Sequence, residues 1–299
     1  MMPRRQHGAV LLMVAIVLAT VAALAVSVNG LASADSRSTQ GDYEVRAAAY
    51  LADAGVAAAR WSNQVAACTS KSIAATPLGS GTFAAEVPTT KGTAKKIDIV
   101  ARGAVNGVTL RTLERKQVTL NDLSKTETVR LTKDARDITI DRTDDDDSDD
   151  DDERLWLAFD SAHALMYWAM SDIKKDALVL SAKLTLTPYG SNGAGGTVAI
   201  QRLTTRWDDD ATWRRPREDV ARWDGGTYIA QPAATAAVAG IATAEWDVTD
   251  LVNGWFSGQY PNYGMLLRLA NPGPSLRFHS LDASSSRRPV LQVLMARQC

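Results

Sequence analysis

Histidine and cysteine are scarce in this chain of 299 residues, which contains three histidines and two cysteines. His163 and His279 have no cysteine or acidic partner at metal or triad spacing, and His7 lies near the N-terminus. The glycine-rich run of residues 190–196 precedes a predicted strand, whereas a phosphate-binding loop needs a helix N-terminus. The sequence shows no catalytic constellation, so we do not expect an enzyme. The paired carboxylates of a glycosidase are neither indicated nor excluded.

The two cysteines, Cys68 and Cys299, lie far apart in the sequence. In an exported protein such a pair can form a disulfide, which would tie the C-terminal residue back to the end of a predicted helix. Their spacing does not show whether the geometry permits the bond. The pair is therefore a candidate disulfide.

The N-terminus carries a long hydrophobic run behind a basic leader. Arg4 and Arg5 precede Gly8, and residues 9–28 are interrupted by only two polar side chains. About 20 apolar residues span the hydrocarbon core of a bilayer, and preceding positive charge holds the N-terminus in the cytoplasm. The sequence predicts a transmembrane helix at residues 9–28, with the rest of the chain outside the cytoplasm.

Three kinds of N-terminus fit this pattern. A secretory signal peptide would be cut near residues 32–34 (Ala-Ser-Ala), although its apolar stretch is usually shorter, roughly 7–15 residues. A signal anchor explains the length of the run. A prepilin-type leader, residues 1–8, would be cut between Gly8 and Ala9 and would leave the apolar helix on the mature protein.

Aromatic and small residues recur after the apolar run at alternating spacings of four and three, which places them on one face of a helix. These residues are Tyr43, Ala47, Tyr50, Ala54, Ala57 and Trp61. Together with the apolar run, the pattern predicts one long helix over residues 9–67.

Residues 47–57 (AAAYLADAGVA) resemble the alanine-rich, acid-Ala-Gly signature that follows the span in PilX-class minor pilins of type IV pili. Residues 5–12 resemble the leader of the same class, so the resemblance covers about residues 4–61. It implies cleavage after Gly8 and a helix that packs among other pilin helices. The residues implied in filament packing are Met13, Tyr43, Tyr50 and Trp61.

One position departs from the major pilins, which carry glutamate at the fifth residue of the mature chain. Here that residue is Met13. A carboxylate in the membrane is costly without a partner. A subunit at the filament tip has no subunit above it to supply that partner, so it needs no glutamate at this position. Met13 thus suits a tip-located minor pilin, and equally a membrane-anchored protein that never enters a filament.

Residues 68–123 predict a small antiparallel sheet. The expected strands cover residues 82–87, 95–102 and 108–120, and Asn106-Gly107 is a strong hairpin signal. A three-stranded sheet needs a helix against it to be stable. We therefore expect the stripe from Tyr43 to Trp61 to pack on the inner face of this sheet, as in a pilin.

A strongly acidic run lies in the predicted linker, residues 124–154. Residues 144–153 carry nine acidic side chains, and since the whole chain has a formal net charge of −1, the remainder carries +8. Such a run is usually a solvated loop. Calcium binds carboxylate oxygens, so the run also supplies candidate calcium ligands, although it lacks the spacing of a known calcium loop. These candidates are Asp144, Asp145, Asp147, Asp149 and Asp151.

Residues 129–297 predict an all-β sandwich, because short strand-like runs recur with turn clusters between them. The helix signal in this region is faint and is limited to one short turn at residues 249–256. Five segments in order resemble motifs of the DNRLRE domain family, a β-sandwich related to carbohydrate-binding modules: residues 172–187, 207–213, 246–258, 262–264 and 278–291. The resemblance covers about residues 129–296 and implies a secreted or cell-wall binding module whose ligand is a surface glycan or a host or cell-wall component.

Tryptophan supplies the candidate ligand contacts. Trp213, Trp246 and Trp255 are expected in the core, where strands of the resembled family meet. Trp207, Trp223 and Tyr228 lie in a long, charged connection and are expected to be exposed. Loops on a rigid sandwich commonly carry recognition.

Taken together, the sequence predicts an α+β pilin-like N-terminal part, with a long transmembrane helix and a small antiparallel sheet, followed by an all-β, jelly-roll-like sandwich. The expected function is that of a tip-located minor pilin or pseudopilin that presents a binding module. The alternative is a membrane-anchored cell-surface structural or glycan-binding protein with no filament role. The implied partners are other pilin subunits and the bacterial inner membrane before assembly, with a later place on the pilus or cell surface. No cofactor beyond candidate calcium and no nucleic-acid partner are expected.

Overall fold

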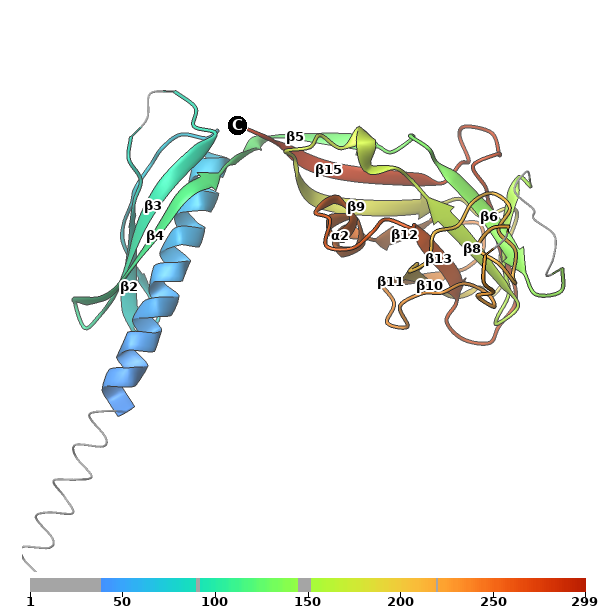
Figure 1. The fold of residues 1–299 in the computed structure, drawn as a ribbon, viewed down its shortest axis with the longest axis horizontal. Helices are drawn as coiled ribbons and strands as arrows, with labels where there is room; N and C mark the ends of the chain where they lie inside the picture. The colour runs from blue at the N-terminus through green and yellow to red at the C-terminus, as the bar shows by residue number, and fades with distance from the viewer. Residues whose placement is uncertain (1–38, 90–91, 145–151, 219) are drawn as a thin grey trace, which may run out of the picture. The chain divides into compact units, whose positions relative to one another are not determined.

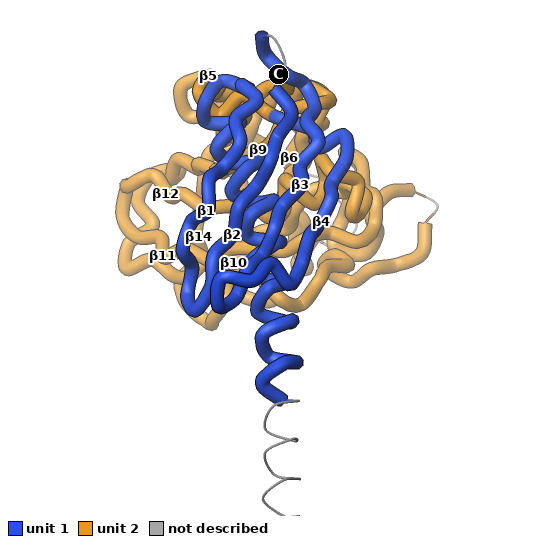
Figure 2. The backbone as a smooth tube through the Cα atoms, turned by 90° about the vertical axis from the view of Figure 1, so that its left-hand side faces the viewer, with its two compact units in different colours: residues 1–120 blue, residues 121–299 orange. Residues whose placement is uncertain are grey.

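The computed structural model describes residues 39–89, 92–144, 152–218 and 220–299. The chain divides into two compact units, residues 1–120 and residues 121–299, which Figure 2 colours separately. The boundary precedes the predicted linker, because residues 121–130 and 136–141 form strands of the second unit. Most of the segment that the sequence assigns to a linker before the acidic run is therefore part of a folded sheet.

The fold class that the sequence predicts, an α+β pilin-like part with a long transmembrane helix followed by an all-β sandwich, is wrong. The structure is mostly β-sheet, with 43% of residues in strands and two α-helices among the described residues. The longer helix is described over residues 39–65, and residues 9–38 of the predicted helix lie outside the described residues. None of the described helices is long and apolar enough to cross a membrane. The predicted span, residues 9–28, lies outside the described residues.

The helix of residues 39–65, which we call the N-terminal helix, ends in a left-handed turn. Ala67 and Cys68 have φ angles of 53° and 62°, and the Cys68 amide donates to the carbonyl oxygen of Asn63 at 2.8 Å. The side chain of Asn63 is fully buried and binds the backbone of Lys71 in both directions, donating at 2.9 Å and accepting at 2.6 Å. Asn63 therefore fixes the path of the chain as it leaves the helix.

Four antiparallel strands form the sheet of the first unit, in the order β1-β2-β3-β4 (Figure 2). They are β1 (Ile73–Leu78), β2 (Gly81–Glu86), β3 (Lys96–Val105) and β4 (Val108–Thr119). Buried and partly exposed residues alternate along β3. Asn106 and Gly107 have φ angles of 53° and 79°, and Val105 pairs with Val108. The predicted hairpin turn is thereby confirmed.

The N-terminal helix packs very closely on this sheet. A Cβ added to Gly103 of β3 would lie 2.0 Å from the carbonyl oxygen of Ala48. Only small side chains fit such an approach, and the buried positions Ala48, Ala52, Gly55 and Ala59 repeat at spacings of four, three and four. The alanine-rich composition of the helix is thus explained by backbone proximity to the sheet.

The prediction that the aromatic stripe packs on the sheet is wrong. Tyr43, Tyr50 and Trp61 are 63%, 77% and 63% exposed. The aromatic and the alanine positions have the same helical spacing but lie on different faces, so periodicity alone did not identify the buried face. Because the sheet leaves no room for a ring, the alanine face is buried and the aromatic face points to solvent.

The second unit contains two large antiparallel sheets that pack face to face (Figure 1). Strands β14 and β7 form a separate two-stranded sheet. The five-stranded sheet has the order β11-β10-β13-β8-β6, formed by β6 (Arg136–Asp141), β8 (Ala162–Tyr167), β10 (Gly196–Arg202), β11 (Ala234–Val238) and β13 (Met265–Leu269). The four-stranded sheet has the order β12-β9-β15-β5, formed by β5 (Asn121–Arg130), β9 (Leu178–Leu186), β12 (Ala244–Asp247) and β15 (Val290–Gln298). The remaining strands are β7 (Arg154–Leu157) and β14 (Leu276–His279).

The main core fills the space between the two large sheets. Leu184 and Val293 approach from the four-stranded sheet, and Val198 and Leu267 approach from the five-stranded sheet, all fully buried. Trp246 lies in this core, and its Nε1 donates to the Val198 carbonyl oxygen at 3.2 Å. The predicted helical turn after β12 is present as α2 (Thr249–Phe256). Inward-facing residues of both sheets thus build a rigid support for the connections outside it.

Candidate functional site

A second apolar cluster lies on the outer face of the five-stranded sheet. Successive residues of a strand point to opposite faces, and in β8 Ala164 and Met166 belong to the main core whereas Leu165 belongs to this cluster. The cluster consists of Ile138, Ile140, Leu165, Leu203, Trp207, Ala211, Trp213 and Leu266. The connection of residues 204–233 covers this face of the sheet with its own tryptophans.

Hydrogen bonds hold this connection against the sheet. The His163 Nδ1 on β8 lies 2.8 Å from the carbonyl oxygen of Gly225, and its ring lies 4.9 Å from the ring of Trp213. Burial lowers the pKa of His163, so the neutral imidazole is favoured there. The Ile229 amide of the connection donates to the Arg202 carbonyl oxygen of β10 at 3.0 Å. The connection is long, but it is tied to the sheet at several points.

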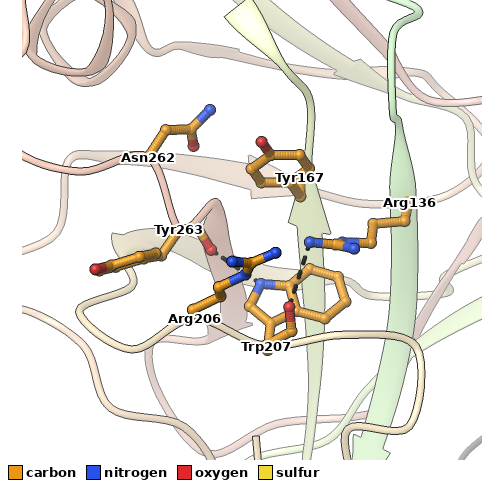
Figure 3. A pocket seen from close by; sticks show the side chains of 6 residues that line it. All are labelled: Arg136, Tyr167, Arg206, Trp207, Asn262 and Tyr263. Carbon is orange, nitrogen blue, oxygen red and sulfur yellow. Dashed lines mark hydrogen bonds between the residues drawn. The ribbon is translucent and has the colours of Figure 1, made fainter. Parts of the chain in front are cut away.

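A polar cavity of about 280 Å³ lies at the edge of this cluster (Figure 3). It is lined by Arg136, Tyr167, Arg206, Trp207, Asn262 and Tyr263. Two of these residues carry guanidinium groups and none carries a carboxylate. The cavity therefore has a positive electrostatic character, with aromatic and amide groups around it.

Arg136 is the most constrained of these residues. Its guanidinium carbon lies 4.7 Å from the ring centre of Tyr167 and 5.1 Å from that of Trp207, so it contacts both aromatic rings. One terminal nitrogen donates to the Trp207 carbonyl oxygen at 3.3 Å, while the buried Nε finds no acceptor among the described residues. Arg136 is thus fixed in place without using all of its donors.

The opposite wall of the cavity is fixed by a short polar motif. The Asn262 side chain donates to the Trp168 carbonyl oxygen at 2.8 Å and accepts from the Gly264 amide at 3.0 Å. Gly264 has a φ of +82°, and a Cβ there would lie 2.3 Å from the Met166 carbonyl oxygen. Trp207 completes the wall, since its Nε1 donates to the Tyr263 carbonyl oxygen at 2.9 Å. The Asn-x-Gly segment therefore fixes one wall of the cavity.

The expectation that Trp207 is exposed is wrong, because its side chain is 1% exposed and forms part of the second cluster. Trp223 and Tyr228 are partly buried and pack against the same cluster. Neither lines the cavity. The rings of Trp223 and Tyr228 pack the connection against the sheet. Trp207 belongs to the cluster and also lines the cavity.

The other sequence candidates lie elsewhere. Gly8, Ala9 and Met13 fall outside the described residues. Asp144 is exposed, and Asp145, Asp147, Asp149 and Asp151 fall outside the described residues. In the described part of the chain no group of three or more His, Cys, Asp or Glu side chains is placed to hold a metal ion. Calcium binding by the acidic run stays a prediction.

Both cysteines, Cys68 and Cys299, are disulfide-bonded, and neither is free. Cys68 is 1% exposed. The bond is compatible with the extracytoplasmic location that the sequence predicts, since disulfides persist in oxidising compartments.

Sequence reasoning missed most of the cavity. Arg136, Tyr167 and Arg206 lie on separate elements, and nothing in their local sequence distinguishes them from other surface residues. Asn262 and Tyr263 stood in a recognised motif, but as part of a fold pattern and not of a site. The available signal was the run of aromatic and basic residues in the connection of residues 204–233. Of the candidates that it gave, only Trp207 lines the cavity.

No protein-family model matches this chain, and no curated protein matches it. The resemblances to PilX-class minor pilins and to the DNRLRE domain family therefore stay predictions.

Proposed function

We propose that this protein is a minor pilin or pseudopilin of a type IV pilus-like system that presents the second unit as a non-catalytic binding module. The observation that carries the proposal is the exposed aromatic face of the N-terminal helix. That face carries Tyr43, Tyr50, Trp61 and Val65, each 45% to 77% exposed.

An isolated subunit gains nothing from large rings in water, whereas contiguous exposed apolar surface marks a protein interaction site. The helix already buries its alanine face on its own sheet. The aromatic face is therefore available to the helix of a neighbouring subunit. The preceding apolar run of residues 9–28, with Arg4 and Arg5 before it, supports insertion of the subunit into the membrane before assembly.

The module is supported by the second unit. A rigid pair of packed sheets carries a connection and a polar cavity, which is an arrangement suited to recognition. The aromatic and cationic lining fits a ligand held by non-covalent contacts.

The first test is N-terminal sequencing of the mature protein. A start at Ala9 supports cleavage of a prepilin leader after Gly8. An intact Met1, or a start at Asp35 after signal-peptide cleavage, contradicts the proposal.

The second test removes the aromatic face in the double variant Tyr50→Ala, Trp61→Ala. Covering a large apolar side chain stabilises by about 2 kcal/mol, so we expect this variant to be lost from the filament fraction sheared off the cells. Leu78→Ala in β1 is the matched control, because Leu78 is 51% exposed but lies off the helix. Unchanged incorporation of the double variant would instead favour a membrane-anchored surface protein with no filament role.

A further inference from the structure

The cavity shown in Figure 3 has an imbalance of charge. The guanidinium groups of Arg136 and Arg206 point toward the same space, and no acidic residue lines it. Neither arginine forms an ion pair with any residue that the structure describes. Like charges that share a small cavity repel each other, so a bound anion would stabilise this arrangement.

Another cavity of the second unit gives a contrast. It has a volume of about 410 Å³ and includes Arg130 and Arg288, but Asp282 lies in its lining as well. Positive charge there has a counter-charge from the protein itself. The cavity at Arg136 and Arg206 has none, which singles it out as a ligand site.

The side chains of the two arginines differ in how tightly the protein holds them. Arg136 is held between Tyr167 and Trp207 and keeps a buried Nε without an acceptor. Little side-chain entropy is lost when such a fixed group binds a ligand. Arg206 is exposed and can close on the ligand from the solvent side. A planar guanidinium matches a carboxylate through two parallel hydrogen bonds.

The rest of the lining narrows the class of ligand. Tyr167 and Tyr263 supply ring surface and hydroxyl groups, which suit a sugar ring with its apolar face and hydroxyls. A volume of about 280 Å³ is at the low end for ligand pockets, so it suits one sugar unit and not a long chain. The lining contains neither a glycine-rich loop nor a helix N-terminus of the kind that commonly holds phosphate.

We propose that this cavity binds the carboxylate of an acidic sugar unit, such as a uronic acid of a surface polysaccharide. Arg136 and Arg206 bind the carboxylate, and Tyr167 and Tyr263 contact the sugar ring. This inference rests on the proposed function only for the location of the ligand at a cell surface.

Isothermal titration calorimetry of the detergent-solubilised full chain tests the site. The probes are galacturonate and glucuronate oligomers, their methyl esters, in which the carboxylate charge is removed, and inorganic phosphate. We expect the acids to bind, and the esters to bind at least about ten-fold more weakly because a charge-assisted hydrogen-bond pair is lost. Binding of the acids should weaken as salt is added.

Three variants locate the binding. Arg206→Gln should weaken binding of the acids at least about ten-fold, and because Arg206 is exposed its loss should leave the fold intact. Arg136→Lys keeps the charge but loses the planar fork, and tryptophan fluorescence reports whether it folds. Arg222→Gln is the matched control, an exposed arginine of the same connection that does not line the cavity, and should bind as the wild type does.

Several results would overturn the proposal. They are equal binding of acids and esters, equal loss in Arg206→Gln and Arg222→Gln, and no binding of any uronate. If phosphate binds the cavity as tightly as the uronates do, the site is a general anion site, and the proposal that it recognises a sugar is refuted. Calorimetry does not depend on filament assembly, so failure here leaves the pilin tests unaffected, and failure of those tests leaves the ligand site standing.

Discussion

The carboxyl group of Asp137 links stability to pH. Asp137 lies on β6, is 5% exposed, and accepts hydrogen bonds from the Leu281 amide at 3.2 and 3.0 Å. Burial raises its pKa from 3.8 to about 7, the Leu281 amide lowers it, and nearby Asp282 and Arg288 act in opposite directions. Below about pH 7 the protonated form is therefore favoured in the folded protein.

The sign of the effect follows from proton binding. Between pH 3.8 and about 7 the folded state holds a proton on Asp137 that the unfolded state has released, so the free energy of unfolding falls as pH rises through this range. A difference of about 3 pKa units corresponds to about 4 kcal/mol. Below about pH 4 this contribution to stability is fully present, and above about pH 7 it is lost.

The perturbation is Asp137→Asn, which keeps an acceptor for the Leu281 amide but cannot titrate. The free energy of unfolding of the wild type should fall by about 4 kcal/mol between pH 4 and pH 7 because of Asp137, and we expect the variant to lack this decline. The buried amide of the variant has an unpaired donor, which should lower the free energy of unfolding by about 1–3 kcal/mol at every pH. Urea unfolding followed by tryptophan fluorescence measures this, since seven of the eight tryptophans lie in the second unit.

His163 provides an opposing slope that both proteins share. Burial lowers its pKa, so its contribution to stability is present above its ordinary pKa of 6.5 and is lost as pH falls. The difference between wild type and Asp137→Asn cancels this contribution. Asp209→Asn, which neutralises an exposed carboxylate, serves as the control and should keep the wild-type slope. An unchanged slope in Asp137→Asn would refute the reasoning.

Two further predictions concern the first unit and the disulfide. Gly103→Ala should destabilise the helix–sheet packing by about 3 kcal/mol, because the new Cβ would meet the Ala48 carbonyl oxygen at 2.0 Å, whereas Gly41→Ala meets nothing within 4 Å and should stabilise by up to about 1 kcal/mol. Circular dichroism melts of the full chain compare the two, and equal melting temperatures would argue against the close approach. Thiol titration of the unreduced, denatured protein should find no free thiol in the wild type and one in each of Cys68→Ser and Cys299→Ser, and two thiols in the wild type would contradict the bond.

Local signals in the sequence were reliable where the cause of a structure is local. The turn at Asn106-Gly107 and the helix Thr249–Phe256 could be read from a few neighbouring residues. Strand β1 was missed because Pro77 and Gly79 signal a loop, although the strand is at the edge of its sheet, where proline is tolerated. Strand β11, Ala234–Val238, was missed because an alanine-rich segment has little strand propensity of its own.

The candidate site depended on contacts that no local pattern contains. Periodicity predicted one repeating face of the N-terminal helix, from Tyr43 to Trp61, as the buried one. The close approach of the helix to the backbone of Gly103 instead places alanines against the sheet and the rings in solvent. The same holds for Trp207, whose charged neighbours suggested exposure while the outer face of β8 buried it.

The sequence by itself determined the alternation of strands and turns, the apolar run at residues 9–28 and the absence of a recognisable catalytic motif, since each is a property of neighbouring residues. Tertiary structure alone decided which helix face is free, and that Arg136 of β6 and Arg206 of a connection meet in one cavity. Those outcomes depend on how closely distant segments approach, and burial and charge at such contacts are set by the fold as a whole.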